Sequence, residues 1–194
     1  TDYTAIIEKI KAARPDVILN TLNGDSNVAF FTQLAEAGIT AEQIPVMSLS
    51  ISESEVSYIG TDLIQGHYVA WNYLQSISTL HNMSFVSRYR KFCQDENAAI
   101  GDPMESAYIA VHLWAAACEK AGTFDVEEVR MASKGLIYEG PEGTVYIDGE
   151  NQHLFGKVRV GKIAPSGLIE EVWKTADAIK PDPYLSSYVW AHGL

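Results

Sequence analysis

Apolar side chains recur along the first 75 residues, first with helical spacing and then in short uninterrupted runs. Helical spacing puts every third or fourth side chain on one face, whereas short apolar runs bounded by turn residues are typical of strands inside a parallel sheet. We predict a helix over 3–10, a strand over 16–20, a helix that starts after Asp25 or Ser26 and ends near Gly38, a strand over 45–49, a helix over 50–59 and a strand over 67–73. The first strand is expected to be buried on both faces. This order of elements predicts an α/β fold built on a parallel sheet with right-handed crossovers.

The pattern changes after residue 75, where helices predominate before the chain becomes extended again. We predict helices over 84–92, 103–121 and 124–132, short extended segments over 136–138 and 144–147, and a hairpin of strands 157–163 and 168–173. The helix over 103–121 carries a broad apolar surface that includes Val111, Leu113 and Trp114. The tail from Lys180 contains two prolines and is expected to be irregular.

The composition predicts a soluble globular chain of one domain or two small ones. Of the 194 residues 47% are hydrophobic and 20% are charged, which supplies enough apolar material for a core. No segment approaches the roughly 20 apolar residues that a membrane-spanning helix needs. The formal net charge of −11 argues against nucleic acid and against anionic membrane surfaces, because both are bound through basic patches.

The sequence lacks four common enzyme motifs, GxSxG, the Walker loop, GxGxxG and HExxH, and we expect no metal and no cofactor. The five histidines are scattered without ligand spacing. Cys93 and Cys118 form no CxxC pair, and two buried free thiols are favoured over a disulfide. Asp102 and Glu105 open the long helix, where they suit its macrodipole better than they suit an acid–base pair. The triplet Asn82-Met83-Ser84 matches a glycosylation acceptor, a pattern short enough to arise often by chance.

Candidate binding residues follow the strands of the predicted sheet, because functional groups in parallel α/β sheets gather at the carboxyl ends of the strands. Three segments occupy these ends, namely 21–25, 48–50 and 71–73. They combine neutral donors and acceptors, one carboxylate and aromatic walls, a set that suits a small polar ligand. The alternative is that the polar residues of the first two segments only cap the helices that follow them.

Six segments form a pattern that is more specific than these general features. They are 18–31 (ILNTLNGDSNVAFF), 66–73 (GHYVAWNY), 102–108 (DPMESAY), 150–154 (ENQHL), 158–161 (VRVG) and 179–184 (IKPDPY). In the same order, and over nearly the whole chain, they resemble the urea-binding and short-chain-amide-binding proteins of ABC transporters, which are type I periplasmic binding proteins. A cytoplasmic amide-sensing regulator of amidase expression shares the fold and part of these patterns. Its loop after the first strand differs, so the transporter branch fits better.

The resemblance implies a two-lobed protein, each lobe an α/β sandwich, whose chain crosses between the lobes three times and which closes on its ligand. Residues 1–75 would belong to the second lobe, 100–148 would return to the first lobe, and 149–194 would hold the last hinge crossing, the hairpin of the second lobe and the tail. The chain starts without an initiator Met or a signal peptide, at a point inside the second lobe of such a protein. We therefore expect an incomplete, carboxy-terminal portion of this fold, accompanied by a missing amino-terminal portion or arranged as a homo-oligomer.

The resemblance also implies ligand-binding residues in the loops after the first two strands. The positions that correspond are Thr21, Leu22, Asn23, Gly24, Asp25, Ser48 and Ser50, with Tyr68 and Trp71 as second choices that would form walls near the hinge. Urea presents four N–H donors and one carbonyl oxygen. Asp25 and Asn23 would accept its hydrogen bonds and Ser50 would donate to its oxygen, and the loss of one buried partner costs about 1–3 kcal/mol.

The function that follows is the capture of urea, with formamide or acetamide as the next choices, by the extracytoplasmic component of an ABC transporter. Its partners would be this small ligand and the transporter permease, and its location periplasmic or extracellular. Three alternatives stay open: a cytoplasmic amide-sensing regulator, an enzyme acting on amides, and a fragment without ligand capacity. The enzyme is disfavoured, because neither cysteine has a histidine at a local spacing that suggests an activated nucleophile.

Overall fold

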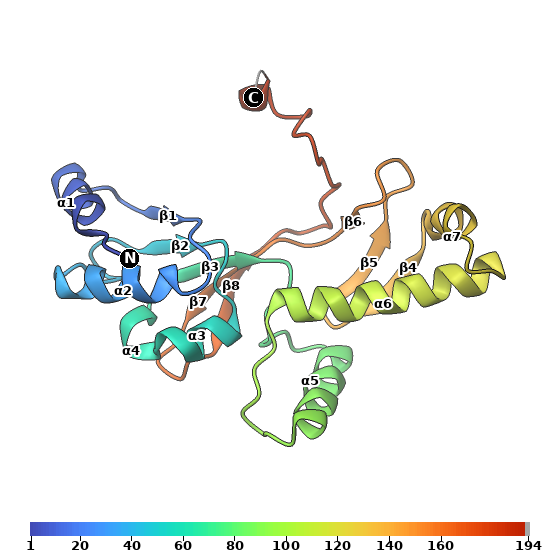
Figure 1. Cartoon of the computed structure of the whole chain (residues 1–194), viewed down its shortest axis with the longest axis horizontal. Helices are drawn as coiled ribbons and strands as arrows, with labels where there is room; N and C mark the ends of the chain where they lie inside the picture. Colours follow the sequence, from blue (N-terminus) through green and yellow to red (C-terminus); the bar gives the residue numbers. More distant parts are fainter. Residues whose placement is uncertain (193–194) are drawn as a thin grey trace.

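The computed structural model describes residues 1–192 of the 194-residue chain, which form two β-sheets with helices packed against them (Figure 1). The elements up to the third strand are α1 (Thr4–Ala13), β1 (Ile18–Asn20), α2 (Ser26–Glu36), β2 (Val46–Ser48), α3 (Glu53–Ile59), α4 (Thr61–Ile64) and β3 (Tyr68–Trp71). Those after it are α5 (Leu80–Cys93), α6 (Asp102–Ala121), α7 (Val126–Ser133), β4 (Ile137–Gly140), β5 (Gly143–Ile147), β6 (Leu154–Phe155), β7 (Arg159–Ile163), β8 (Ile169–Lys174) and the 3-10 turn η1 (Val189–Ala191). Every predicted helix and strand is present with shifted bounds, whereas α4, β6 and η1 were not predicted.

The larger sheet has the strand order β1-β2-β3-β7-β8. β1, β2 and β3 run parallel, with α2 between the first two and α3 and α4 between the second and third, so the predicted parallel arrangement is confirmed for these strands. β7 and β8 extend the sheet as the predicted hairpin, and because β7 is antiparallel to β3 the whole sheet is mixed. The register sets Asn20 beside Ser48 and Ser48 beside Val69. The carboxyl ends of the three parallel strands therefore lie at one edge.

A continuous apolar core fills the space between the larger sheet and its helices. Phe31 and Leu34 on α2 are almost completely buried, as are Val46 on β2 and Val69 on β3. Figure 1 shows α2, α3 and α4 together along one side of this sheet. Burial of apolar area, worth about 25 cal/mol per Å², is the main force that holds this part together.

The exposure of β1 contradicts the prediction that this strand is buried on both faces. Leu19 keeps 71% of its area exposed and Val17 is also exposed, whereas Asn20 is buried. Successive side chains of a strand point to opposite faces, so Val17 and Leu19 lie on a face that residues 1–192 leave uncovered. An apolar run predicted the strand but could not predict what would lie against it.

The smaller sheet is antiparallel, with the order β4-β5-β6. The predicted turn at 140–143 joins β4 to β5. The core of this part is small: Ile109 and Leu113 on α6 pack against Val145 and Ile147 on β5.

The opposite side of α6 is exposed and apolar, as the sequence predicted for this helix. Val111 and Trp114 both lie open to solvent, and the Trp114 ring stacks on the exposed ring of Phe124 with 6.1 Å between their centroids. Neighbouring apolar side chains that stay exposed mark a surface that can contact another molecule.

Two stretches of chain connect the sheets. Residues 72–79 lead from β3 to α5, and residues 156–158 lead from β6 to β7. The Asn72 Nδ2 group donates to the Lys157 carbonyl (2.9 Å), which ties the two connections together. Figure 1 shows the larger sheet on one side of this junction and α6 with the smaller sheet on the other.

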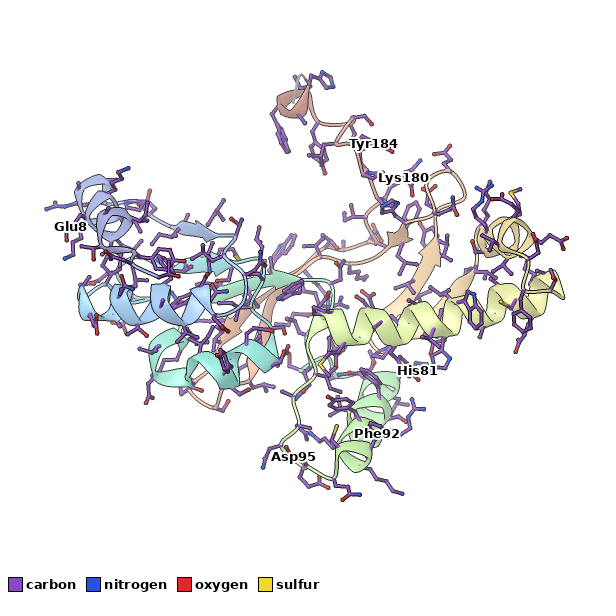
Figure 2. The ribbon with its side chains drawn as sticks, viewed as in Figure 1. Glu8, His81, Phe92, Asp95, Lys180 and Tyr184 are labelled. Carbon is purple, nitrogen blue, oxygen red and sulfur yellow. The ribbon has the colours of Figure 1, made fainter. Side chains whose placement is uncertain are left out.

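The carboxy-terminal tail leaves the junction and extends away from both sheets, as the position of Tyr184 in Figure 2 shows. Its first residues are held by Lys180, whose Nζ donates to Glu150 (2.8 Å), and by Asn151, whose Nδ2 donates to the Pro181 carbonyl (3.0 Å). The expectation of an irregular tail is confirmed up to the short turn η1.

Along residues 1–192, no helix combines the length and the apolar character that crossing a bilayer requires. Both cysteines are free, and Cys118 is buried as predicted. Cys93 is exposed, which corrects the prediction of burial, because it is the last residue of α5 and this end of the helix lies open to solvent.

Candidate functional site

The candidate site lies where β1, β2 and β3 end. The loop 21–25 follows β1 and the segment 49–52 follows β2, and the pairing of these adjacent strands brings both segments to the same edge of the larger sheet. Trp71 is the last residue of β3, so it lies at this edge too.

A buried network of neutral side chains shapes the first loop. The Asn20 Nδ2 group donates to Asn27 Oδ1 (2.8 Å) and to Ser48 Oγ (3.0 Å), and Asn20 Oδ1 accepts the backbone N–H of Leu22 (2.9 Å). Asn27 Nδ2 in turn donates to the Leu22 carbonyl (2.9 Å). Because Asn20, Asn27 and Ser48 are all buried, this network positions the loop and does not face solvent.

Two further contacts join the loops to each other and to β3. Ser50 Oγ donates to the carbonyl of Leu22, which links the second loop to the first. The indole Nε1 of half-buried Trp71 donates to the Ile51 carbonyl (2.6 Å). The Ser50 hydroxyl proton is thus already engaged, and Ser50 can donate to a ligand only if this contact breaks.

The groups that remain open to solvent are those at the tip of the first loop. Thr21, Asn23, Gly24 and Asp25 are exposed, and Asn23 Nδ2 makes only a long hydrogen bond to the Thr21 carbonyl (3.4 Å). Asp25 stands at the N-cap position of α2, as predicted, but its side chain makes no capping hydrogen bond, so the carboxylate stays open to solvent. Gly24 has a φ of +58°, a conformation that favours glycine and that makes the sharp turn of this loop possible.

The predicted site residues therefore fall into three groups. Thr21, Asn23, Gly24 and Asp25 lie together on an open surface, whereas Leu22, Ser48, Ser50 and Trp71 are tied into the scaffold beneath it. Tyr68 lies apart from both groups. It is at the amino end of β3, where the Lys162 ammonium lies 5.6 Å from its ring centroid, and it lines a separate cavity of about 930 Å³ with Gly66 and His67.

Asn20 and Asn27 are the residues that inspection of the sequence missed. Each was inside a segment that was assigned as a strand or a helix, and nothing in the spacing marked them as partners. A polar amide that ends an apolar run was the available signal, because a buried amide needs hydrogen-bond partners close by.

Burial decides the role of two other residues that were considered from the sequence, Asn82 and His67. Asn82 is buried and its side chain bonds Tyr73 Oη (2.7 Å) and the carbonyls of Gln75 (2.9 Å) and Ile77 (2.7 Å), so it is no glycan acceptor in this fold. His67 is a satisfied core histidine, whose Nδ1 accepts the Val46 N–H (3.0 Å) and whose pKa burial lowers to about 4. No group of three or more His, Cys, Asp or Glu residues within 1–192 is arranged to hold a metal ion.

Comparison with known proteins gives a consistent result. The profile of the periplasmic binding protein domain matches residues 1–189. A solute-binding protein of an ABC transporter from Rhodopseudomonas palustris HaA2, solved with p-hydroxybenzoic acid, superposes with a TM-score of 0.82 at 24% identity over 97% of this chain and 52% of that one. A solute-binding protein from Rhodopseudomonas palustris BisB5, solved with 3,4-dihydroxybenzoic acid, gives a TM-score of 0.81 at 26% identity over 94% and 50%. The amino acid ABC transporter substrate-binding protein of Pseudomonas fluorescens Pf-5 gives 0.80 at 21% identity over 93% and 49%.

A curated relative, the limonene hydroxylase of Geobacillus stearothermophilus, is 24% identical over 132 residues, which is 68% of this chain and 24% of that protein. This identity is too low, over too small a share of that protein, to carry an activity across. The chain spans about half the length of the solved relatives. Because the family profile covers nearly all of the chain and the solved relatives share its fold, the predicted fold class is confirmed and the chain belongs to the periplasmic binding protein domain family.

Proposed function

We propose that this chain is part of an extracytoplasmic solute-binding protein that delivers a small ligand to the permease of an ABC transporter. The family match and the solved relatives support this role, and they support a periplasmic location. The open polar loop at the carboxyl end of β1 is the observation that carries the proposal, because ligands of open α/β sheets bind at such strand ends.

The ligand that we propose is urea or a short amide. The open tip of the first loop supplies the Asp25 carboxylate, the Asn23 side-chain amide and the backbone of Thr21 and Gly24. The Asp25 carboxylate and Asn23 Oδ1 accept hydrogen bonds, and urea has four N–H groups to donate. No Lys or Arg occurs in 21–25 or in 48–52, so neither loop carries the cation that would best hold a carboxylate ligand.

An aromatic carboxylic acid is the second candidate. Two of the solved relatives are complexes with hydroxybenzoic acids, and the half-buried ring of Trp71 supplies an aromatic wall at the same edge of the sheet. Asp25 distinguishes the two candidates, because its negative charge favours a donor-rich neutral ligand and repels a carboxylate.

The decisive experiment is calorimetric titration of the complete gene product with urea, acetamide and 4-hydroxybenzoate, for the wild type and for Asp25→Asn. If urea is the ligand, Asp25→Asn weakens its binding about tenfold or more, since a hydrogen bond to a charged group is worth about 1.5–3 kcal/mol. If a carboxylate is the ligand, the same substitution leaves its binding unchanged or strengthens it. Asp16→Asn is the matched control, because Asp16 is exposed at the opposite end of β1.

Binding of none of the three ligands by the complete gene product would contradict the urea and aromatic-acid assignments together. Release of ammonia from urea or acetamide would favour the alternative of an amide-acting enzyme. A cytoplasmic amide-sensing regulator of the same fold would bind amides in the same way, and it is distinguished by finding the protein inside the cell after fractionation.

The division of the chain between two lobes also stays a proposal. Residues 1–75 and the hairpin within 149–194 would form part of one lobe, and 100–148 would form part of the other. The presence of two separate sheets supports this division. The exposed apolar side of α6 supports a further expectation, that an amino-terminal portion or a second copy of the chain covers it.

A further inference from the structure

Four carboxyl side chains meet at the junction of the two sheets. Glu53 comes from the first turn of α3, Asp102 and Glu105 from the first turn of α6, and Glu142 from the turn between β4 and β5. All four residues are at most 9% exposed. The elements that carry them belong to both halves of the molecule, so the cluster bridges the two sheets.

Two of these carboxyl groups, those of Asp102 and Glu53, hold the connection that leaves β3. Asp102 Oδ1 accepts the backbone N–H groups of Asn72 (3.0 Å) and Tyr73 (2.7 Å), the first two residues after that strand. Glu53 Oε1 accepts the backbone N–H of Gln75 (2.6 Å) in the same connection. Glu105, also in the first turn of α6, contributes indirectly, because it bonds the β4–β5 turn, whose Pro141 carbonyl accepts a hydrogen bond from Thr79 at the end of the same connection.

Glu105 and Glu142 bond each other next to the second connection, residues 156–158. Glu105 Oε1 accepts the backbone N–H of Glu142 (3.0 Å). A Cβ atom built on Gly156 would lie 3.5 Å from Glu142 Oε2, so this carboxyl group lies directly against the connection between β6 and β7. The cluster therefore contacts both stretches of chain that connect the two sheets.

Positive charge in the cluster comes from Arg159, which is 5% exposed. Its guanidinium donates to the carbonyl of Asn72 and to that of Glu142 (2.8 Å), and its Nε pairs with Glu171 (2.9 Å). The guanidinium therefore bonds the connection after β3 and the β4–β5 turn, and part of its charge is neutralised by Glu171. The ionisable groups that face the four carboxyls from the surrounding elements are Glu55 on α3, Tyr73 after β3, Arg90 on α5, Tyr138 on β4, Arg159 on β7 and Glu171 on β8.

One oxygen of each glutamate is buried without a hydrogen-bond partner among residues 1–192, namely Oε2 of Glu53, of Glu105 and of Glu142. An ionised carboxylate that is buried in this position and faces other carboxylates is costly. A protonated carboxyl group carries no charge, and its Oε2–H group can donate a hydrogen bond.

Burial, together with the neighbouring carboxylates, raises the pKa of Glu105 to about 8 and that of Glu142 to about 7. Burial likewise raises the pKa of Glu53 to about 7. The pKa of Asp102 is also raised by burial, against the backbone N–H groups of Tyr73 and Asn72 that favour its ionised form. The three glutamates thus titrate close to neutral pH.

We propose that Glu53, Glu105 and Glu142 form a proton-operated latch between the two sheets, which is closed when they are protonated and loosened when they ionise. Loss of the protons sets like charges against one another at a place that both connections touch. Rotation of one sheet against the other therefore becomes easier as the pH rises from about 6 to 9. This device is independent of the ligand proposed above.

The sign of the effect on stability follows from the direction of the pKa shifts. In the unfolded chain these carboxyls titrate near pH 4.3. The folded protein keeps their protons to a higher pH, so it binds more protons than the unfolded chain in the interval between. Stability is therefore greatest below that interval and falls as the pH rises to about 8, and each group steepens the rise of the unfolding constant by up to about tenfold per pH unit.

The test is the pH dependence of unfolding by guanidinium chloride between pH 5 and 9, for the wild type and for Glu105→Gln. The glutamine amide is nearly isosteric with the carboxyl group and stays neutral. In the variant, the number of protons released on unfolding, given by the slope of the unfolding free energy against pH, should therefore fall by up to one. Glu119→Gln is the control, because Glu119 is exposed near the other end of α6. Parallel pH profiles for the wild type and Glu105→Gln would overturn the proposal. If Glu105→Gln does not fold, Glu142→Gln makes the same test from the facing turn.

Two spectroscopic measurements separate a latch from a merely buried residue. The infrared spectrum at pH 6 should contain the carbonyl band of protonated carboxyls, which should weaken by pH 9 and be smaller in Glu105→Gln. Hydrogen exchange at the backbone amides of Tyr73 and Glu142, corrected for intrinsic base catalysis, should quicken in the wild type over the same pH range. Absence of the band at pH 6, or constant protection of both amides, would contradict the latch.

Discussion

The two sheets differ in how completely their helices are enclosed. α2 on the larger sheet buries Phe31 and Leu34 within a core that continues through β2 and β3. α6 on the smaller sheet buries Ile109 and Leu113, whereas Trp114 on its other side is 55% exposed. On the larger sheet, α2 finds partners for its apolar side chains within the described structure. On the smaller sheet, α6 finds partners for only some of its apolar side chains.

This difference indicates that apolar content by itself does not make a region self-sufficient. α6 is longer than α2 and has exposed apolar residues opposite its buried side, yet its core within residues 1–192 is the smaller one. The physical reason is geometric, because a helix with apolar residues on two sides needs a layer on each side. The larger sheet should therefore dominate the stability of the protein.

The largest expected effect comes from a matched pair of leucines. Leu34→Ala should reduce the free energy of unfolding by about 3–4 kcal/mol, since Leu34 is 1% exposed in the larger core and its removal leaves a cavity. Leu113→Ala should cost about 2 kcal/mol, since the smaller core can collapse into the space from its open side. Guanidinium chloride is the suitable denaturant, because urea is the proposed ligand. Equal losses for the two variants would remove the distinction between the cores.

The pH dependence of stability caused by His67 tests how completely the larger core is shielded from solvent. An unfolded histidine takes up a proton near pH 6.5, whereas burial lowers the pKa of His67 to about 4. The unfolded chain therefore binds the extra proton between these values, and stability is lost as the pH falls from about 6.5 to 4. The loss attributable to His67 should approach about 3 kcal/mol.

The comparison protein for this measurement is His67→Asn, whose Oδ1 can accept the Val46 N–H in place of the imidazole Nδ1. Subtracting its pH profile from that of the wild type removes the contribution of the carboxyl groups at the junction. A difference that does not change between pH 7 and 4 would mean that His67 is more accessible than its burial implies.

The smallest effect on stability should come from Trp114→Glu. Because this side chain is more than half exposed, the change in the free energy of unfolding should stay below about 1 kcal/mol. Association through the open side of α6 should weaken strongly, which sedimentation would measure. Phe92→Glu serves as the control, since Phe92 is exposed on α5, away from α6 in Figure 2. Unchanged association of Trp114→Glu would show that another surface makes the contact.

The candidate site was predictable in outline but not in detail. The order of strands and helices predicted that 21–25 and 48–50 would meet at one sheet edge, and the register of β1 and β2 brings them there. The sequence could not indicate that Ser50 would donate to the Leu22 carbonyl, because this contact depends on how the loops after β1 and β2 are placed relative to each other in the folded protein. The resemblance implied Tyr68 and Trp71 together as walls near the hinge, but the two residues stand at opposite ends of β3, which face different surroundings.

The sequence by itself determined the secondary structure, the α/β class and the polar character of the loops, because hydrophobic spacing and turn residues act over short distances. Only the tertiary structure decided that β1 has an open face, that Cys93 is exposed, and that Asp102 and Glu105 lie in a buried cluster with Glu142. In the sequence these two acids were ordinary residues at a helix start. Their unusual properties come from burial and from charges that are distant along the chain, and neither can be seen before the chain is folded.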